Sequence, residues 1–513
     1  MLYGAEQFKE LFEKYQDRPI FLYGDPDCDG LFALWLMTKF CDMLGKTYEL
    51  HVNEHRHHGF IYPIDKLKGK LVIAADFHIT REEVEELVNH DVVLLSTDHH
   101  DIKGEYVDIS NDMYGTEGII INNQYYFEPE EDRYLSGAGV FYELISSLYP
   151  EFKCKLYEAI VGISLLTDVR ATESEKAKAY LRTAFRIDPE TPYIKYLIDN
   201  TSTGDYTFGM PRMDRNFIDY TLSPTINALL RYNKTQEAID FILEKGLQRG
   251  NQYRQSQSDL MTVMAERVRL LCLSSVNILA ILDTDFMDYA NVELSDFIGL
   301  LCSNFKDKYG GKSVLGFTVA NNKVTRASFR GKYDDIPYLS SIRQLIPNAD
   351  GHQTAFGIKN FEPTQDLWIN LNDLISDLES NHVKTANILE VSNLAALLNE
   401  KGLKIAEENC YVRDCFRTYI KYIGSNVQVI KTSYKMIEMT YQDRLNGLTP
   451  DMKKGDKEYK YLLDDNGRRI PKFIEYLVDG RKMKSFGEPL EQCVILPILE
   501  KGYIQLYVKP FPE

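Results

Sequence analysis

The stretch that decides the fold reads Gly24-Asp25-Pro26-Asp27-Cys28-Asp29-Gly30. It directly follows the apolar run Ile20-Phe21-Leu22-Tyr23 and precedes a helical pattern over residues 31–44. Carboxylates at three alternate positions, at the end of a strand, bring like charges into one small volume, which is costly unless a cation neutralises them. The stretch therefore predicts a strand, a site for a divalent metal ion and a helix, in that order.

The segment around this motif alternates short apolar strands with amphipathic helices. Strands are expected at 20–23, 48–52, 71–75, 92–96 and 118–121, and helices at 5–16, 31–44, 81–90 and 139–148. Such alternation is typical of a parallel, doubly wound sheet, in which ligands collect at the carboxyl ends of the strands. The acidic motifs follow these apolar runs, so we expect them at one edge of the sheet.

The pattern of expected helices and strands changes along the chain and predicts four structural parts. Residues 1–233 form the parallel-sheet domain, and residues 234–272 form a connecting helix. Residues 273–384 form a second, smaller α/β domain, with strands at 277–282, 313–319 and 325–329 and a helix at 294–309. Residues 385–513, rich in mixed strands and turn signals, form a C-terminal β-rich domain.

Composition and charge narrow the class of protein. The eight cysteines among 513 residues are scattered without a C-x-x-C pair, which argues against a structural zinc site or a disulfide framework. No window resembles a membrane span or a signal peptide, so we expect a soluble, cytoplasmic protein with no membrane partner. The net charge of −17 argues against indiscriminate coating of nucleic acid, but it permits a local basic groove on an acidic body.

Four motifs fit one metal centre. Besides the first motif, Asp76 follows the apolar run 71–75, Asp98-His99-His100 follows the run 92–96, and Asp168 follows the run 160–166. Carboxylate and imidazole suit Mn²⁺- or Mg²⁺-like ions without any thiolate. A single aspartate after a strand is usually a turn or cap residue. Four such ends together with an Asp-His-His triplet indicate a shared site instead.

The triplet Asp98-His99-His100 resembles the signature of the DHH phosphoesterases, and Asp27-Cys28-Asp29-Gly30 resembles their first motif. Asp76 and Asp168 match their second and fourth motifs. Within that superfamily the chain resembles the RecJ-type single-stranded-DNA exonucleases, on the Asp-x-Asp-x-Asp-Gly form of the first motif, the helix start Ser136-Gly137-Ala138-Gly139-Val140 and residues 222–231. Residues 297–301, 328–331 and 351–357 resemble the DHH-associated domain, so the resemblance covers roughly 18–375. Cys28 replaces a usual alanine, and Asp350 replaces a glycine before Gly351-His352.

The resemblance implies hydrolysis of phosphodiester bonds with two divalent metal ions, Mn²⁺ or Mg²⁺. It implies these ligands, with Asp76 as the bridge: Asp27, Asp29, Asp76, His99 and Asp168. Asp25 would support the first motif, Asp98 would orient a ligand histidine, and His100 would lie beside the metals or on the phosphate. The substrate contacts that the resemblance and the residue types favour are Asn227, Arg231, Arg330, Gly351 and His352.

The stretch 53–59 resembles the family only loosely. Arg56 is a candidate phosphate contact there, while a solvated turn is an equally good interpretation of His55, His57 and His58. The RecJ resemblance also makes an OB-like fold a candidate for the C-terminal domain.

We therefore expect an exonuclease that removes mononucleotides from the 5′ end of single-stranded DNA. Roles in DNA repair or recombination, and single-strand-binding or replication/repair proteins as partners, go with that resemblance. RNA or short oligonucleotides remain open as substrates. One alternative is a DHH hydrolase of short oligonucleotides or cyclic dinucleotides, disfavoured by the length, the segment 222–231 and the additional C-terminal domain. Another is an inactive RecJ-like replication or repair scaffold, disfavoured by the complete set of motif acids.

Overall fold

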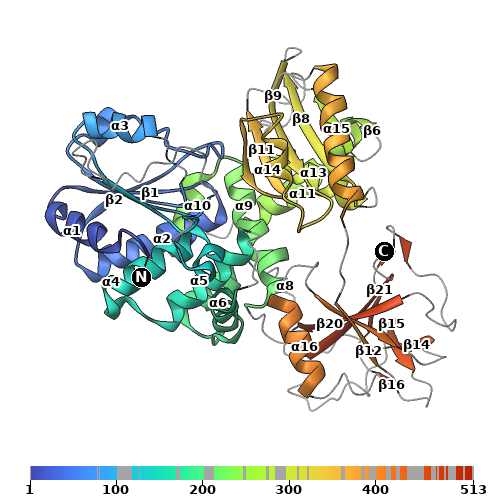
Figure 1. Cartoon of the computed structure of the whole chain (residues 1–513). Helices are drawn as coiled ribbons and strands as arrows, with labels where there is room; N and C mark the ends of the chain where they lie inside the picture. The colour runs from blue at the N-terminus through green and yellow to red at the C-terminus, as the bar shows by residue number, and fades with distance from the viewer. Residues whose placement is uncertain are drawn as a thin grey trace.

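The computed structural model arranges the chain in three bodies, coloured from blue to red along the sequence in Figure 1. It describes residues 2–77, 79, 81–100, 118–125, 128–168, 174–201, 213–246, 250–272, 276–282, 296–308, 311–320, 323–359, 364–382, 387–391, 400–411, 417–422, 428–435, 456–463, 469–470, 473–475, 477–478, 481–482, 493–500 and 503–510. No helix in these ranges is both long and apolar enough to cross a membrane.

The first body is built on a five-stranded, fully parallel sheet in the order β2-β1-β3-β4-β5. Its strands are β1 (Ile20–Gly24), β2 (Tyr48–Val52), β3 (Leu71–Ala75), β4 (Val93–Asp98) and β5 (Gly118–Asn122). Gly24 pairs with Ala75, and Ala75 pairs with Thr97, so the carboxyl ends of β1, β3 and β4 lie side by side. The predicted parallel sheet is confirmed.

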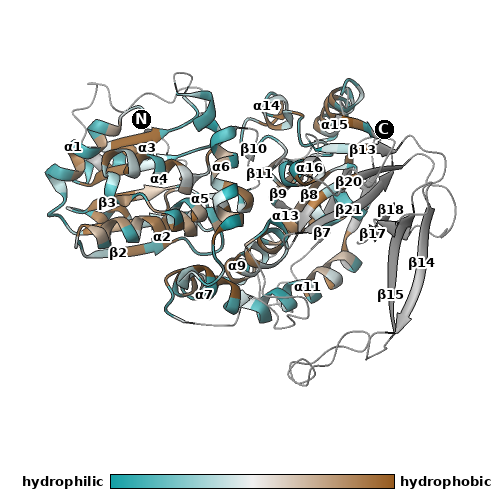
Figure 2. Cartoon of the chain, turned by 90° about the horizontal axis from the view of Figure 1, so that it is seen from below, coloured by the Kyte–Doolittle hydropathy of each residue, from teal (hydrophilic) through white to brown (hydrophobic). Residues whose placement is uncertain are grey.

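Both faces of this sheet are covered, because its strands are apolar on both sides. Ile20 and Leu22 of β1 belong to the core under the helices α1 (Ala5–Tyr15), α2 (Cys28–Met43), α4 (Gly137–Leu148) and α5 (Lys155–Thr167). Phe21 and Tyr23 point to the opposite face, where α3 (Arg81–Asn89) packs. Helix α2 is buried along most of its length and carries hydrophobic residues on several sides (Figure 2).

Helix α2 begins at Cys28, three residues before the expected start. The reason is Asp27, whose side chain accepts a hydrogen bond from the backbone of Gly30 and so caps the helix within the motif itself. The first acidic motif is therefore half loop and half helix.

A largely helical segment follows the first sheet. It comprises the 3₁₀ turns η2 (Glu130–Tyr134) and η3 (Pro150–Phe152), the helices α6 (Glu175–Arg186), α7 (Pro192–Thr201) and α8 (Arg215–Phe217), the π-helical turn η4 (Ile218–Leu222), and α9 (Ser223–Arg231). The 3₁₀ turn η1 (Ile64–Leu67) lies earlier, between β2 and β3. The single connecting helix expected over 234–272 is wrong: the structure has α10 (Thr235–Ile242) and α11 (Gly250–Arg267), and strand β6 begins at Arg269. Left-handed backbone at Glu244 and Gly246 ends α10, whose apolar face belongs to the first core.

The second body contains a six-stranded sheet in the order β10-β11-β9-β8-β7-β6, in which only the pair β7 and β8 is parallel. Its elements are β6 (Arg269–Cys272), β7 (Val276–Leu282), α13 (Ile298–Lys308), β8 (Ser313–Ala320), β9 (Lys323–Arg330), α14 (Tyr338–Ile342), β10 (Ala349–His352), β11 (Ala355–Lys359) and α15 (Gln365–Ser380). Separate apolar clusters form around α13 and around α15, so helices pack on the sheet as the predicted α/β pattern requires.

The third body is rich in β-strands, as predicted. A five-stranded sheet contains β12 (Asn387–Val391), β13 (Thr418–Tyr422), β17 (Phe473–Glu475), β20 (Cys493–Glu500) and β21 (Tyr503–Pro510). Smaller sheets contain β14 (Gln428–Lys435), β15 (Asp456–Leu463) and β16 (Arg469–Ile470), and β18 (Leu477–Val478) and β19 (Arg481–Lys482). Helix α16 (Glu400–Tyr411) attaches this body to α6, through the Arg182–Glu408 pair at 3.3 Å and stacking of Tyr411 on Phe185. An OB-like fold for this part stays a prediction.

Candidate active site

The acidic motifs meet at the carboxyl edge of the first sheet, as the sequence predicts. Three overlapping groups have candidate ligand atoms within 4.8 Å of one another: Asp25, Asp27 and Asp76; Asp76, His99 and His100; and Asp29, His99 and Asp168. Asp76 and His99 each belong to two of these groups. All the predicted metal ligands are therefore brought together, and Asp25 and His100 join them.

The first motif is held by the helix starts that surround it. The carboxylate of Asp29 accepts hydrogen bonds from Gly137 N at 2.7 Å and Ala138 N at 3.2 Å, at the N-terminus of α4, where the helix dipole favours negative charge. A Cβ atom at Gly30 would lie 2.5 Å from the carbonyl oxygen of Asp25, so only glycine fits there. Asp25, expected to be a supporting acid, belongs with Asp27 and Asp76 to one ligand group.

Asp76 adopts a backbone conformation that few residues other than glycine adopt. Its φ is 67°, in the left-handed region, and its N–H donates to Thr97 O at 2.9 Å. A Cβ at Gly137 would lie 2.5 Å from Cβ of Asp76, so this glycine leaves the room that the carboxylate occupies. Backbone strain of this kind, fixed by the surrounding structure, is typical of functional sites.

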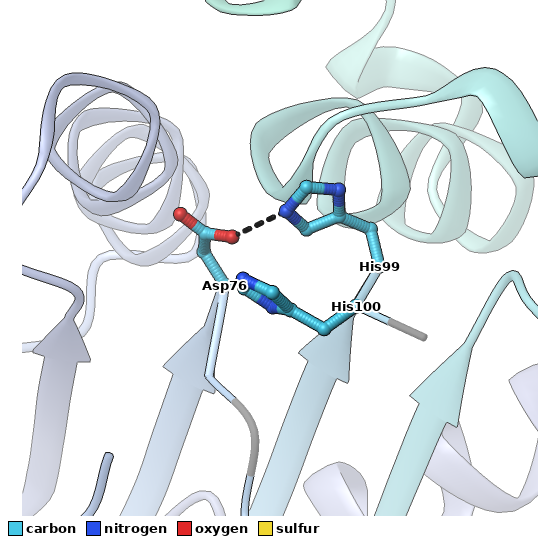
Figure 3. Close-up of side chains that lie close together, drawn as sticks. All are labelled: Asp76, His99 and His100. Atoms are coloured by element: carbon cyan, nitrogen blue, oxygen red, sulfur yellow. Dashed lines mark ion pairs between the residues drawn. The ribbon is translucent and has the colours of Figure 1, made fainter. Parts of the chain in front are cut away.

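Asp76 and His99 are arranged as two ligands of one ion would be. Nε2 of His99 lies 2.8 Å from Oδ1 of Asp76, and Nδ1 lies 3.5 Å from Oδ2 of Asp168; Figure 3 shows Asp76 with His99 and His100. Both Asp76 and His99 are buried, and Oδ1 of Asp76 accepts no hydrogen bond with acceptable geometry from the described residues. A buried carboxylate oxygen in contact distance of an imidazole nitrogen, without a hydrogen bond, fits a metal ion between them.

The electrostatics of the group also require a cation. Burial, followed by repulsion from neighbouring carboxylates, raises the pKa of Asp76 and of Asp29 well above the usual range, and burial with the charge of Asp25 raises the pKa of Asp27. Carboxylates in such surroundings stay ionised at neutral pH when a divalent ion balances them. The residues present therefore fit the ions that the motif pattern implies.

Asp98 organises the second histidine of the triplet. Its Oδ1 accepts from the backbone N–H groups of His99 and His100, at 2.8 and 3.2 Å, and lies 2.8 Å from Nδ1 of His100. Its Oδ2 accepts from Asn122 at 3.1 Å. Burial lowers the pKa of His100, but the charge of Asp98 outweighs it and raises that pKa to about 10. The side chain that Asp98 orients is thus His100, while it fixes His99 through the backbone.

The second body reaches this centre through His352. Its Nε2 lies 2.8 Å from Oδ1 of Asp168, and its ring lies nearly parallel to that of His100, with centroids 6.0 Å apart. Gly351 has φ 134°, and its N–H donates to Oδ1 of Asp350 at 3.1 Å rather than pointing freely at a ligand. Arg343 lies 3.4 Å from the Asp350 carboxylate and balances the charge that replaces the usual glycine.

Three arginines gather beside the centre. Burial, followed by the charges of Arg56 and Arg330, lowers the pKa of Arg231 well below its usual range, and burial with the charge of Arg56 lowers the pKa of Arg330. Arg231 donates to Gln257 at 2.9 Å, and Arg330 donates to Ser303 and Ser328 at 3.2 and 2.9 Å. Among the described residues, no ion pair joins any of the three to a carboxylate. Asn227 instead donates to the Ser223 hydroxyl at 3.0 Å.

The loop after β2 contributes more than the sequence indicates. Nδ1 of His58 lies 2.6 Å from Oδ2 of Asp25, and Nε of Arg56 donates to Pro26 O at 3.4 Å. His55 N donates to Asn233 at 3.0 Å, next to the end of α9. His57 and His58 are exposed, as a solvated turn requires, but His55 and His58 also make these specific contacts. The sequence signal that could have indicated these contacts is the position of the loop. It follows the carboxyl end of a strand of the same sheet, where the acidic motifs also lie.

Asn53 ties this loop together. The hydroxyl of Tyr23 donates to Asn53 Oδ1, and Asn53 Nδ2 donates to the carbonyl oxygens of His57 and Gly59 at 2.7 and 2.8 Å. Asn53 and Tyr23 are both buried. A single buried amide thus fixes the turn that carries Arg56 and His58.

Residues 19–166 match the model of the DHH family, N-terminal domain. This part of the chain is a DHH-family domain. Its fold is RecJ-like: the structure of RecJ in complex with Mn²⁺ from Thermus thermophilus matches with a TM-score of 0.64 at 15% identity, over 100% of this chain and 71% of that chain. The Mg²⁺ complex from the same organism matches with a TM-score of 0.58 at 12% identity, over 100% and 70%.

A manganese-bound exonuclease RecJ structure matches with a TM-score of 0.51 at 16% identity, over 75% of this chain and 96% of that chain. Identities this low establish the shared fold alone. No curated protein matches the sequence.

Proposed function

We propose that this DHH-superfamily protein is a metal-dependent exonuclease that hydrolyses phosphodiester bonds of single-stranded DNA from the 5′ end and releases mononucleotides. The observation that carries the proposal is the juxtaposition of two features: a buried carboxylate–histidine centre and, beside it, three arginines without carboxylate partners among the described residues. The first suits bond cleavage, and the second suits recognition of a phosphate.

The centre has room in its ligand set for two divalent ions, Mn²⁺ or Mg²⁺. Asp25 and Asp27 serve one end of the group, Asp29 and Asp168 serve the other, and Asp76 with His99 belongs to more than one ligand group, which supports Asp76 as a bridge. Bound ions of this kind lower the pKa of a water molecule and polarise phosphate oxygens. His352, in contact with Asp168, donates a hydrogen bond to the phosphate under attack.

The arginine group supports recognition of a chain end. Buried guanidinium groups without carboxylates are costly unless an anion pairs with them, and their planar donors match phosphate oxygens. A terminal phosphate carries nearly two negative charges, more than a phosphate inside a strand. A phosphorylated 5′ end offers such a group, whereas a 3′ hydroxyl end does not. The group Arg56, Arg231 and Arg330 therefore favours entry of the 5′ end.

The test is digestion of single strands labelled at either end, in DNA and in RNA, with Mn²⁺ and with Mg²⁺. The proposal expects early release of the 5′ label as a mononucleotide, while the 3′ label stays on a shortening strand. Release of the 3′ label first would contradict the polarity, and preference for RNA would contradict the substrate.

Two controls address the alternative functions. Faster cleavage of a dinucleotide than of a long strand would favour a hydrolase of short oligonucleotides or cyclic dinucleotides. Absence of hydrolysis with either ion, together with no shift of the melting temperature by Mn²⁺, would favour an inactive scaffold. Action in DNA repair or recombination, beside single-strand-binding or replication/repair proteins in the cytoplasm, belongs to the same proposal.

A further inference from the structure

Tyr220 is an aromatic side chain in an unusual place. It is 68% exposed, the largest exposed fraction among the large hydrophobic residues that the structure describes. It lies in the π-helical turn η4, whose neighbouring residues Ile218 and Leu222 are fully buried. Single π-helical turns within helices are frequently found at functional sites. A singly exposed tyrosine on a surface needs no explanation by itself, so its neighbours decide what it can do.

Tyr220 shares one helix face with the phosphate-binding candidates. Pro224, Asn227 and Arg231 follow it at intervals of three or four residues, which places all four on one side of the continuous helix formed by η4 and α9. The opposite side is buried. This stripe therefore has an exposed aromatic ring at one end and the buried guanidinium of Arg231 at the other, separated by on the order of 16 Å along the helix axis.

The stripe passes the metal centre. The side chain of Ser223 lies close to the thiol of Cys28, which stands between Asp27 and Asp29 in the first motif. Ser223 is three residues from Tyr220, and Arg231 is eight residues further on. The order along the helix is therefore arginine group, metal-binding motif and tyrosine.

This order matches the order of groups in a single strand. With a terminal phosphate on the arginine group and the scissile phosphate at the metal centre, the nucleotides that follow run toward Tyr220. Aromatic rings stack on any base, because every base has a π-face, and this suits a nuclease that must accept all sequences.

We propose that Tyr220 is a stacking subsite for a nucleobase on the 3′ side of the scissile bond. The inference rests on the proposed function, since it assigns a place to part of the same substrate. It adds a base-binding site to a centre that otherwise contacts phosphate.

The test measures binding of 5′-phosphorylated, fluorescently labelled single-stranded DNA, about a dozen nucleotides long, to the full chain carrying Asp76→Asn, which keeps the strand intact. Tyr220→Ala in this background should weaken the dissociation constant by about 5- to 100-fold, as loss of one stacked base predicts, and Tyr220→Phe should restore it. Tyr3→Ala, which removes another exposed tyrosine, should leave binding unchanged.

A scan with one abasic nucleotide at each position locates the stacked base. The Asp76→Asn protein should lose affinity at one position beyond the first phosphodiester bond, and the Tyr220→Ala form should be indifferent at that position. Equal binding by the Tyr220→Ala form, or a loss without any position dependence, overturns the subsite. If the wild-type chain neither binds nor cleaves single strands, the proposed function fails together with it; if it does both while Tyr220→Ala changes nothing, only the subsite fails.

Discussion

Asp76 carries an energetic burden that the rest of the chain must offset. It is buried, its backbone is left-handed, and it faces other carboxylates at the sheet edge. Each of these features destabilises the metal-free protein, because buried like charges repel and left-handed backbone costs of order 1 kcal/mol. Asp76 therefore contributes to the proposed function by binding a metal ion rather than to the stability of the metal-free protein.

The substitution Asp76→Asn separates binding from stability. It removes a charge but keeps a residue type that tolerates left-handed backbone. We expect nuclease activity to fall by at least about 10³-fold, since several kcal/mol of charge stabilisation disappear. The melting temperature without metal should rise, by about 2–4 °C for each kcal/mol of repulsion removed. Calorimetry in a chelator and labelled-strand digestion measure the two effects; a lower melting temperature would contradict the electrostatic account.

The raised pKa values of Asp27, Asp29 and Asp76 predict an unusual pH dependence. Between about pH 4 and these raised values, the native protein holds more protons than the unfolded chain, so metal-free stability falls as the pH rises. Other groups titrate too, and the comparison is therefore with Asp76→Asn. The gain in melting temperature of Asp76→Asn over the wild type, in chelator, should grow between about pH 4.5 and pH 8. A gain that is constant over this range would count against the cluster.

At the scale of elements, the first residue of α4, Gly137, has no side chain and so leaves room for the side chain of Asp76. Gly137→Ala would place a Cβ 2.5 Å from that of Asp76 and force the carboxylate to move. We expect activity to fall about 10²-fold, the usual effect of a displacement near 1 Å. The variant should still fold, because alanine has a higher helix propensity than glycine. The matched control is Gly139→Ala, whose nearest contacts are side-chain carbons at 3.2 and 3.3 Å; equal rates for the two variants would refute the steric argument.

The loop after β2 depends on Asn53. Asn53→Ala removes the donor for the carbonyl oxygens of His57 and Gly59 and leaves buried groups unpaired, which costs about 1–3 kcal/mol. Because Arg56 and His58 lose their support, we also expect a lower kcat/KM on 5′-phosphorylated strands, measured at a temperature where the variant is folded. Asn200→Ala, which removes a single hydrogen bond to Tyr196, is the control. A Mn²⁺-induced rise in melting temperature should survive in both variants.

Helices and strands were predictable where one local pattern determines them. The strands β1, β3 and β5 follow from continuous apolar runs. Helix α2 begins earlier than the sequence predicts, because Asp27 is both its N-cap and a candidate metal ligand. The single-helix prediction followed the polar helical spacing, which continues across Glu244. It gave too little weight to Gly246, whose positive φ follows the end of α10, and α10 itself packs on the first core. The local pattern left two interpretations of the histidine-rich loop open, because the order of the loop depends on Tyr23, which belongs to another strand.

At the scale of the whole molecule, the site needs two bodies of the protein. His352→Ala should lower kcat by about 10²–10³-fold, the loss expected for one donor to a phosphate in the transition state. The Mn²⁺-induced rise in melting temperature should remain, because the carboxylates stay in place. His382→Ala in the same body, where His382 pairs with Asp335 at 2.9 Å, is the control and should retain activity. Loss of metal binding in His352→Ala would make this histidine a ligand instead.

The metal centre was predictable from sequence because each of its residues ends a recognisable apolar element. The arrangement of parts was not, since the contact of His352 with Asp168 and the meeting of Arg56, Arg231 and Arg330 depend on packing between distant segments. The expected phosphate contact through the Gly351 N–H also depended on a neighbour, and Asp350 takes that donor.

The contact between His352 and Asp168 joins residues 184 positions apart. A ribosome that adds about 5–20 residues per second needs roughly 10–40 s to synthesise that interval. During this time the nascent chain already contains every carboxylate of the centre but lacks the histidine that meets the phosphate. For the proposed nuclease, the order of synthesis therefore permits early capture of metal ions and postpones cutting, so that no single strand meets a complete active site on an unfinished chain.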